Sequence, residues 1–336
     1  MLRSLVRRSL GVLRWALCGI GAAALLITAL IATPLAPVPE LDSISAARRT
    51  VDFSALPAIE RFQARDGTWL GFRHYPATGA ATGRAAIVIH GSSGSSGSTI
   101  HALSGALAAR GVETWAVDIR GHGASGSRGD ISYVGQLEDD MADLVAEIRK
   151  SAPSAPLTLV GHSSGGAFAL RVAGSPIQNL FERAVLLAPY LGYDAPSTRS
   201  DSGGWASADI PRIIGLEVLR AVGINCCEQL PVLALAVPPD SQKTQVGIYT
   251  DRLMRNFAVH RDFRRDLAAA TRPITIFSGA DDELMLSDKY ADAVRGAPVP
   301  VDIRLLDGIN HMAIVAAPKA VSLVADDVAT RGQAGS

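Results

Sequence analysis

The sequence predicts an α/β fold in which a mostly parallel sheet is covered by helices on both faces. Short apolar runs suited to buried strands alternate with helical segments from about residue 58, and the alternation resumes after a break between Tyr190 and about Ala270. Such runs are typical of strands covered on both faces, and their alternation with helices indicates βαβ units. The chain has 336 residues, 48% of them apolar, which suffices for one large domain with an insertion or for two domains.

The composition argues against several classes of function. Lys and Arg together number 32, and so do Asp and Glu, so there is no basic excess to recommend a nucleic-acid partner. Three cysteines, Cys18, Cys226 and Cys227, cannot form a disulfide framework, and we interpret the adjacent pair as two small buried apolar residues. We expect no metal site, because no Cys/His cluster has the spacing of a zinc site.

The first 33 residues predict an N-terminal transmembrane helix. Arg3, Arg7, Arg8 and Arg14 precede an apolar run from Trp15 to Ala32. As a helix this run would be about 27 Å long, close to a bilayer core of ~30 Å. We interpret it as an uncleaved signal anchor with a cytoplasmic N-terminus and an exported catalytic domain. The alternative is a signal peptide cleaved before Thr33, which would leave a secreted or periplasmic protein, but the residues before that point fit a cleavage site poorly.

The remaining chain divides into a tether, a core in two parts and an inserted cap. Pro34, Pro37 and Pro39 predict a stiff tether at residues 34–57. The core is expected at 58–190 and 271–330, followed by a tail at 331–336. Strands are expected at 58–64, 68–75, 85–89, 112–119, 157–160, 184–188, 273–277 and 301–306, and helices at 100–109, 137–150, 167–173, 286–295 and 318–330. The insertion at 191–270 is too long for a plain loop, so we expect a helical cap over the strand ends, where ligands bind in such sheets.

The segment Gly161-His162-Ser163-Ser164-Gly165 predicts a reactive serine. A strand precedes it and a helical run of small residues follows, which is the context of a nucleophile elbow. A Cβ at Gly161 or Gly165 would collide with neighbouring backbone when the turn strains Ser163. Ser163 is therefore the expected nucleophile, and it requires a base that is itself oriented by an acid.

Two later loops carry the candidate base and acid. Strand 301–306 is followed by His311, and strand 273–277 is followed by consecutive Asp281, Asp282 and Glu283. Both loops lie at carboxyl ends of strands, the edge at which Ser163 is expected. We predict His311 as the base and Asp282 as the acid, with Asp281 and Glu283 solvated or facing the cap.

Two backbone amides are expected to hold the oxyanion of the reaction. One belongs to Ser164, directly after the nucleophile, and the other to Ser92 in the loop after strand 85–89. The loop from Gly91 to Gly97 could instead bind phosphate, but it lacks the Gly-Lys-Ser/Thr ending. Three histidines, His90, His122 and His162, adjoin tight turns, which favours hydrogen bonds to backbone over metal ligation.

These motifs together resemble a known family. His90-Gly91-Ser92, the run from Asp118 to Ser125, the serine elbow, Gly279-Ala280-Asp281-Asp282 and Gly308-Ile309-Asn310-His311 look like the motif set of α/β-hydrolases. They are most similar to the monoacylglycerol lipase and lysophospholipase group, often grouped with serine aminopeptidases. The resemblance covers about residues 58–330. It implies an eight-stranded sheet, a helical cap between strands six and seven, no cofactor, and an ester or lipid-like substrate. The loop after His90-Gly91 is richer in Ser and Gly than is usual in the family.

These motifs allow three hypotheses about the function. The leading hypothesis is a membrane-tethered serine hydrolase that cleaves small-molecule or lipid esters through an acyl-enzyme. Its acyl pocket is expected under nine apolar cap residues, which could alternatively be the cap's own packing: Ile213, Ile214, Leu216, Val218, Leu219, Leu230, Val232, Leu233 and Leu235. An aminopeptidase would need an acid such as Glu217, Glu228 or Asp209 to bind the substrate amine. A non-catalytic binding protein has no physical need of a complete Ser/Asp/His set. The sequence leaves the oligomeric state open.

Overall fold

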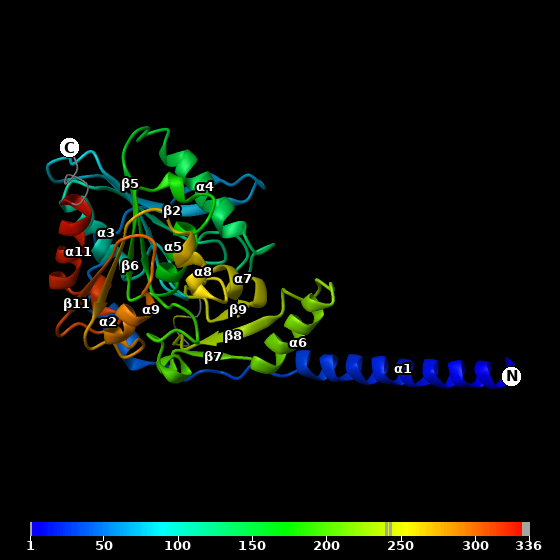
Figure 1. Cartoon of the computed structure of the whole chain (residues 1–336). Helices are drawn as coiled ribbons and strands as arrows, with labels where there is room; N and C mark the ends of the chain where they lie inside the picture. Colours follow the sequence, from blue (N-terminus) through cyan, green and yellow to red (C-terminus); the bar gives the residue numbers. More distant parts are fainter. Residues whose placement is uncertain (1, 239–240, 242–243, 331–336) are drawn as a thin grey trace.

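The computed structural model describes residues 2–238, 241 and 244–330 of the chain. Figure 1 shows a body built around a central sheet, from which one long N-terminal helix projects. The predicted tail at 331–336 lies outside the described residues.

The main sheet has eight strands in the order β1-β2-β4-β3-β5-β6-β10-β11. Pairings β1–β2 and β2–β4 are antiparallel and all others are parallel, which confirms the predicted mostly parallel sheet. The strands are β1 (Glu60–Gln63), β2 (Trp69–Tyr75), β3 (Ala85–Ile89), β4 (Glu113–Val117), β5 (Leu157–His162), β6 (Arg183–Leu187), β10 (Ile274–Gly279) and β11 (Val301–Leu306). Every residue of β3, β5, β6 and β10 is buried, as expected for strands covered on both faces.

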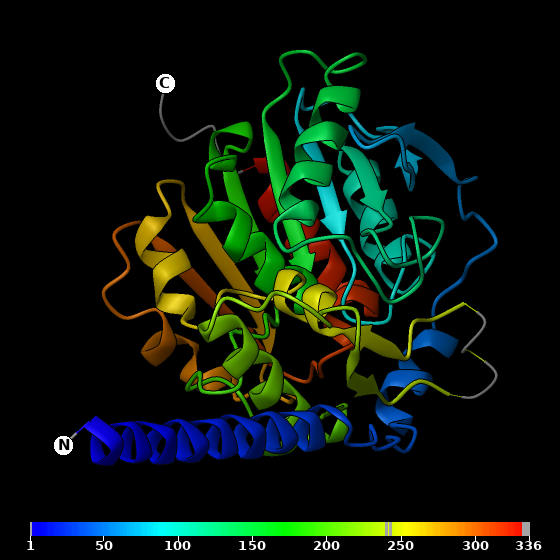
Figure 2. The same cartoon turned by 90° about the vertical axis from the view of Figure 1, so that its right-hand side faces the viewer.

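Helices cover both faces of this sheet (Figures 1 and 2). One apolar cluster takes residues from α4 (Gln136–Ile148), α5 (Ser164–Ala173) and α8 (Phe263–Ala269). A second cluster takes residues from α3 (Ile100–Ala109), α10 (Ala313–Ala316) and α11 (Pro318–Thr330). The helix expected at 286–295 is shorter, with a 3₁₀ turn at Ser287–Lys289 followed by α9 (Tyr290–Ala293). Two other short 3₁₀ turns occur at Gln178–Leu180 and Ser200–Gly204.

The insertion between β6 and β10, the sixth and seventh strands of the main sheet, is only partly helical. It contains α6 (Ile210–Ala221) and α7 (Asp251–Asn256), and also a three-stranded antiparallel sheet of β7 (Ala206–Ala208), β8 (Pro231–Leu235) and β9 (Ile248–Thr250). The cap expected at this place in the chain is thus present with its helices, and it also contains a small sheet that the sequence did not predict. The central strand, β8, pairs with two very short strands from distant parts of the insertion, and such pairing leaves no local periodicity in the sequence.

The adjacent cysteines lie between α6 and β8 of this cap. Cys226 is exposed and Cys227 is partly exposed, so the prediction that both are buried apolar residues is wrong. Cys227 has a φ of 69° and lies in the turn between α6 and β8.

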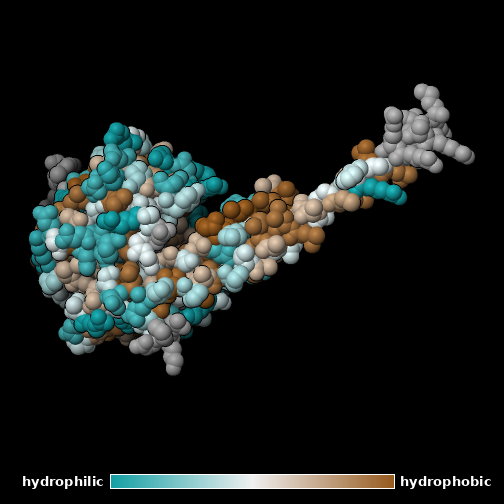
Figure 3. All heavy atoms as spheres, turned by 90° about the horizontal axis from the view of Figure 1, so that it is seen from below, coloured by the Kyte–Doolittle hydropathy of each residue, from teal (hydrophilic) through white to brown (hydrophobic). Residues whose placement is uncertain are grey.

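The N-terminal helix α1 (Leu2–Ile31) is exposed along its apolar length (Figure 3). Residues Leu10–Ile31, with a mean hydropathy of 2.0, form a stretch long and apolar enough to cross a membrane, a property that signal sequences share. The end of α1 packs on α6, where a Cβ on Gly215 would lie 2.9 Å from Cγ1 of Ile31. The absence of a side chain at Gly215 lets these two helices approach closely.

The tether is not a plain extended linker. Residues Asp42–Arg49 form a helix, α2, which the three upstream prolines did not predict. Its first turn carries Asp42 and its last turn carries Arg48 and Arg49, which complements the helix dipole at both ends. Ile44 packs against the hydrophobic core, so α2 is attached to the body of the protein.

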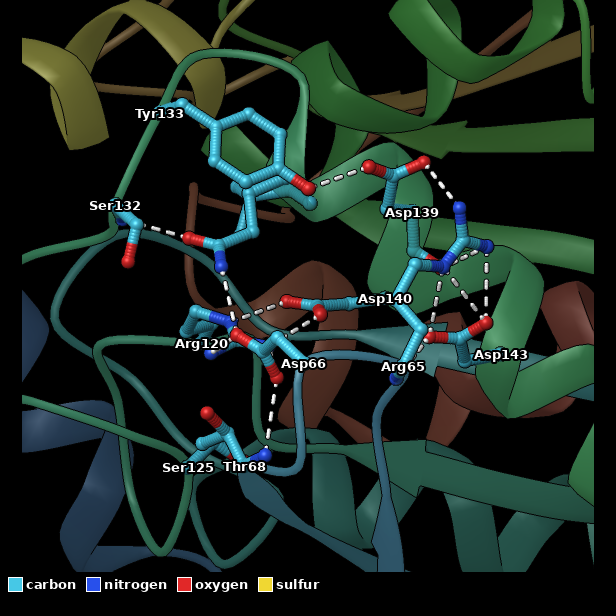
Figure 4. Close-up of polar contacts among 12 residues, drawn as sticks. Arg65, Asp66, Thr68, Arg120, Ser125, Ser132, Tyr133, Asp139, Asp140 and Asp143 are labelled. Atoms are coloured by element: carbon cyan, nitrogen blue, oxygen red, sulfur yellow. Dashed lines mark hydrogen bonds and ion pairs between the residues drawn. The ribbon is translucent and has the colours of Figure 1, made fainter.

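A buried arginine fixes the loop that follows β4. Arg120 donates to both carboxylate oxygens of Asp140 at 2.6 and 2.7 Å and to those of Asp66 at 2.9 and 3.2 Å (Figure 4). The nearby Arg65 forms a more exposed set of contacts with Asp139 and Asp143. Arg120 thus ties this loop to α4 and to the β1–β2 turn on the side of the sheet where the candidate site lies.

Candidate active site

Ser163 lies in the tight turn between β5 and α5, with φ 54° and ψ −117°. The two glycines of the motif permit this turn. A Cβ on Gly161 would lie 2.1 Å from the carbonyl oxygen of Gly165, and one on Gly165 would lie 2.4 Å from the carbonyl oxygen of His90. Because atoms cannot approach so closely, only glycine fits at either position, as the sequence pattern predicts.

His311 and Asp282 meet directly. Nδ1 of His311 lies 2.9 Å from Oδ2 of Asp282, and both residues are buried. The other carboxylate oxygen of Asp282 accepts the amides of Leu284 and Met285, each at 2.8 Å. Burial acts to raise the pKa of Asp282, but the charge and hydrogen bond of His311 and these two amides outweigh burial, so the pKa is lowered. The carboxylate is therefore ionised and fixed in orientation.

The two acids beside Asp282 differ from each other. Asp281 is exposed, as expected. Glu283 is not simply solvated or facing the cap, because its Oε2 accepts the backbone amide of His311 at 3.0 Å. Sequence reasoning missed this contact, since it depends on how two separate loops pack. Glu283 thus holds the backbone of His311 while Asp282 holds its ring.

His162 fixes the other side of His311. Its Nε2 donates to the carbonyl oxygen of His311 at 3.1 Å. Burial first, and then the charge of His311, lower the pKa of His162 to about 3, so its ring is neutral near pH 7. His90 likewise uses Nδ1 to contact the carbonyl of Gly91 at 2.7 Å. These contacts agree with the structural roles expected for the histidines beside glycine turns.

Ser163 and His311 face the same cavity, whose volume is about 290 Å³. Polar and apolar side chains line the cavity together, and they come from the loop after β3, the cap, the tether and the loops that carry Ser163 and His311. Its lining residues are Glu40, Ile44, Ser45, Arg48, Arg49, Gly91, Ser92, Ser93, Gly94, Ser98, Thr99, His162, Ser163, Trp205, Pro238, Ser241, Gln245, Leu284, His311 and Met312. Among the described side chains, no group of three His, Cys, Asp or Glu residues is close enough to hold a metal ion.

Both candidate oxyanion donors lie next to Ser163. Ser164 begins α5, so its amide has no acceptor within the helix. Ser92 follows Gly91, where a Cβ would lie 3.2 Å from Cβ of Ser163. In the described part of the chain no acceptor lies within hydrogen-bond distance of the Ser92 amide, whereas the amides of Ser93 and Gly94 are both used. The two free N–H groups can therefore donate to a ligand oxygen.

Residues of the cap hold the Ser92 loop in place. The indole of Trp205 donates to Oγ of Ser92 at 2.7 Å, and the amide of Val246 donates to the carbonyl of Ser93 at 3.2 Å. The hydroxyl of Tyr249 accepts the amide of Ser93 at 2.7 Å and lies 2.6 Å from Nε2 of His122. Burial lowers the pKa of His122 well below its usual value, so its neutral ring can accept the Tyr249 proton. Tyr249 could not be singled out from the sequence, because the strand that carries it, β9, was not predicted.

The cap does not supply the expected acyl pocket. None of the nine apolar residues proposed for it lines the cavity. Leu216, Val232 and Leu235 are buried in packing, whereas Ile214 and Val218 are exposed. The cap instead contributes Trp205, Pro238, Ser241 and Gln245. The expectation is wrong because the buried apolar side chains of α6 and β8 pack elsewhere in the protein and the exposed ones face away from the cavity.

The acids considered for amine binding are also elsewhere. Glu217 pairs with Arg220, and Glu228 pairs with Arg220 and Arg255. Asp209 caps α6 and pairs with Arg212. None of the three acids lines the cavity. Glu40 is the one carboxylate among the described residues that does.

Comparison with solved structures supports the fold. A soluble variant of the monoglyceride lipase of Saccharomyces cerevisiae, in complex with a substrate analogue, superposes with a TM-score of 0.60 at 17% identity, covering 89% of this chain and 95% of the other. A bacterial membrane phospholipase A described as a virulence factor gives 0.55 at 15% identity, covering 96% and 97%. The monoacylglycerol lipase of Paleococcus ferrophilus gives 0.55 at 17%, covering 77% and 98%.

Sequence comparison identifies the family. No curated protein matches the chain. The family model described as serine aminopeptidase, S33 (Hydrolase_4), matches residues 81–315, which is well over half of the chain. This range includes Ser163, Asp282 and His311. The chain therefore belongs to the serine aminopeptidase S33 family and is an α/β-hydrolase.

Proposed function

We propose that the protein is a serine esterase that cleaves carboxylic esters of a lipid-like kind, of the monoacylglycerol or lysophospholipid type. The observation that carries this proposal is the buried Asp282–His311 pair, joined at 2.9 Å and opening into the cavity that contains Ser163. In this role Ser163 is the nucleophile, His311 the general base and acid, and Asp282 the group that orients His311.

The reaction proceeds in two halves. Ser163 attacks the ester carbonyl as His311 takes the hydroxyl proton, and the amides of Ser92 and Ser164 stabilise the oxyanion. His311 then returns the proton to the leaving alcohol, and an acyl group remains on Ser163. Water attacks this acyl-enzyme with His311 again acting as base. The acid is released and the Ser163 hydroxyl is restored.

The lining of the cavity favours ester over aminopeptidase activity. A peptidase that removes N-terminal residues needs a carboxylate to bind the substrate amine, and Glu217, Glu228 and Asp209 all lie outside the cavity. The one carboxylate among the described lining residues, Glu40, shares the cavity with the two cations Arg48 and Arg49, which repel an amine. The neighbours named as a monoglyceride lipase and a membrane phospholipase A are consistent with a lipid ester.

Replacing the nucleophile tests the function. Turnover of a short p-nitrophenyl ester by the Ser163→Ala variant should fall at least about 10⁴-fold, with unchanged thermal unfolding. Ser175→Ala, at the opposite end of α5, is the matched control and should retain activity. Comparable turnover in wild type and Ser163→Ala would contradict the assignment. Faster cleavage of an aminoacyl p-nitroanilide than of the ester would favour the peptidase.

The contact between α1 and the cap supports an uncleaved membrane anchor. Nε of Arg212, a buried residue, donates to the carbonyl of Ile31 at 2.8 Å, and the hydroxyl of Thr33 donates to Oδ1 of Asp209 at 2.7 Å. Cleavage before Thr33 would remove the Ile31 carbonyl from Arg212 and expose the face of α6 that contacts α1. Intact-mass measurement of the membrane-fraction protein should find residues 2–32 retained, and a mature terminus near Thr33 would refute the anchor.

A further inference from the structure

The tether helix α2 forms one wall of the cavity that contains Ser163. Five tether residues line this cavity: Glu40, Ile44, Ser45, Arg48 and Arg49. In Figures 1 and 2, α2 lies at the same end of the body as the cap strands. It packs against α10, which directly follows the His311 loop. The segment between the membrane helix and the hydrolase core is therefore part of the candidate active site.

The chain after α2 is fixed to the core. The ring of Phe53 stacks on His101 of α3 with centroids 5.8 Å apart and an interplanar angle of 26°. Further along, the guanidinium of Arg73 donates to the carbonyl of Pro57. These contacts hold the C-terminal end of the tether, while Ile44 packs on the core within α2. The position of α2 relative to Ser163 is thus set by contacts within α2 and in the segment that follows it.

The charges on this wall are predominantly positive. Among the described residues that line the cavity, Glu40 is the single acid and Arg48 and Arg49 are the two strong bases. Most arginines of the body have a carboxylate partner, Arg120 and Arg220 among them. Neither Arg48 nor Arg49 has a carboxylate within ion-pair distance among the side chains that the structure describes, although Arg48 lies 5.8 Å from the ring centroid of Phe53. Stabilisation of the helix dipole explains basic residues in the last turn of α2, but it does not require both to line a cavity.

We propose that Arg48 and Arg49 bind the phosphate of an anionic lipid ester whose acyl carbonyl lies at Ser163. This inference rests on the proposed esterase function and specifies its substrate class. Guanidinium groups bind phosphate through paired, charge-assisted hydrogen bonds. The hydroxyls of Ser45, Ser98 and Thr99 line the same cavity and suit the hydrogen-bonding groups of a glycerophosphate alcohol part.

The location of the wall fits such a substrate. Residues 32–41 connect the candidate membrane helix to α2, and ten residues span at most about 35 Å. The cavity therefore lies within reach of the headgroup layer of the membrane that α1 would cross. A substrate amine, by contrast, would meet two cations and one carboxylate on this wall.

Matched lipid substrates test the proposal. The full-length protein in neutral detergent micelles is assayed with 1-oleoyl lysophosphatidic acid and with 1-oleoylglycerol, which share the acyl chain and differ only in the phosphate. The wild type should prefer the anionic lipid by about tenfold in kcat/KM. The Arg48→Gln/Arg49→Gln double variant should lose this preference, mainly through a higher KM for the anionic lipid.

The control removes the same charge elsewhere. Arg264→Gln/Arg265→Gln replaces two exposed arginines of α8 that do not line the cavity, and it should keep the wild-type preference. An equal loss of preference in both double variants would indicate a general effect of protein charge and would overturn the proposal. An unchanged preference in Arg48→Gln/Arg49→Gln would also overturn it.

Inorganic phosphate in the assay distinguishes a lipid headgroup from a free anion. Competition at the headgroup subsite should raise KM for the anionic lipid in the wild type but not in the Arg48→Gln/Arg49→Gln variant. An equal effect of phosphate on the turnover of 1-oleoylglycerol would mean that the arginines bind a free anion, contrary to the proposal. Absence of turnover with either lipid would instead indicate failure of the esterase function itself.

Discussion

The cavity has two kinds of wall, and they are built differently. At the carboxyl edge of the main sheet, Ser163, Asp282 and His311 are each less than one-tenth exposed. The acid and base are hydrogen-bonded to each other, Asp282 also accepts backbone amides, and the His311 amide donates to Glu283. The second wall, formed by α2 and the cap, contributes hydroxyl groups and the guanidinium groups of Arg48 and Arg49. The side chains at the sheet edge are fixed by hydrogen bonds, whereas the wall formed by α2 and the cap carries the groups that, under the proposed function, would select the substrate.

The largest expected effect is at the edge. The Asp282→Asn variant should lower kcat by about 10⁴-fold, because the amide no longer fixes the tautomer of His311 or stabilises its protonated form. Stability should change little, since Oδ1 can still accept the amides of Leu284 and Met285. Asp281→Asn, which changes the exposed neighbouring carboxylate, is the control for ester turnover. Equal losses in the two variants would contradict the role given to Asp282.

The buried ion pairs of Arg120, which hold the loop after β4, should contribute to the stability of the fold. The Arg120→Leu variant leaves Asp140 buried without its partner, and burial already raises the pKa of Asp140. We expect a loss of about 3–5 kcal/mol in the free energy of unfolding, measured by chemical denaturation. Arg65→Leu removes the neighbouring exposed pairs in Figure 4 and should cost under about 1 kcal/mol. Similar losses would show that burial does not distinguish the two networks.

Acid should destabilise the edge through its buried neutral histidines. The pKa of His162 is about 3 in the folded chain, below its ordinary value of 6.5. Below pH 6.5 the unfolded chain binds a proton that the folded chain does not, so stability falls as the pH falls towards 3. Between pH 7.5 and 5.5, His162 alone should account for a loss of about 1.4 kcal/mol. The His162→Gln variant should show a correspondingly shallower pH dependence, and an unchanged dependence would refute this origin.

The smallest expected effect is at the junction between the cap and the edge. The Tyr249→Phe variant leaves the Ser93 amide without its acceptor and should loosen the adjacent Ser92 donor. We expect kcat to fall about tenfold, or ~1.4 kcal/mol, with KM within twofold. Tyr290→Phe removes another buried hydroxyl, which donates to the Pro189 carbonyl, and should cost stability but not kcat. Equal losses of kcat in Tyr249→Phe and Tyr290→Phe would contradict a specific effect of Tyr249 on the Ser92 donor.

The residues at the carboxyl edge of the main sheet could be predicted because short, local sequence patterns indicate them. The apolar runs at 85–89 and 301–306 coincide with β3 and β11, and glycine sterics place Ser163 in its turn. Three loops at the ends of parallel strands necessarily converge, so residues far apart in the sequence could be assigned to one edge.

The peripheral wall could not be predicted because it depends on long-range packing. Glu283 contacts the amide of His311 only after two loops meet, and Tyr249 reaches Ser93 only after β9 pairs with β8. The prolines before α2 indicate a stiff connection, but nothing in their spacing shows that Arg48 and Arg49 line the cavity. Apolar residues of the cap were expected at the pocket because composition does not show which neighbours they pack against.

The most direct test of the central claim is the site of reaction with a fluorophosphonate probe. The full-length protein is treated with the probe, digested, and the modified peptide is mapped by mass spectrometry. We predict a single adduct on Ser163 that is lost in Ser163→Ala and forms far more slowly in His311→Ala. Absence of labelling under conditions that label a control serine hydrolase, or modification of a different residue, would contradict the account and favour a non-catalytic binding protein.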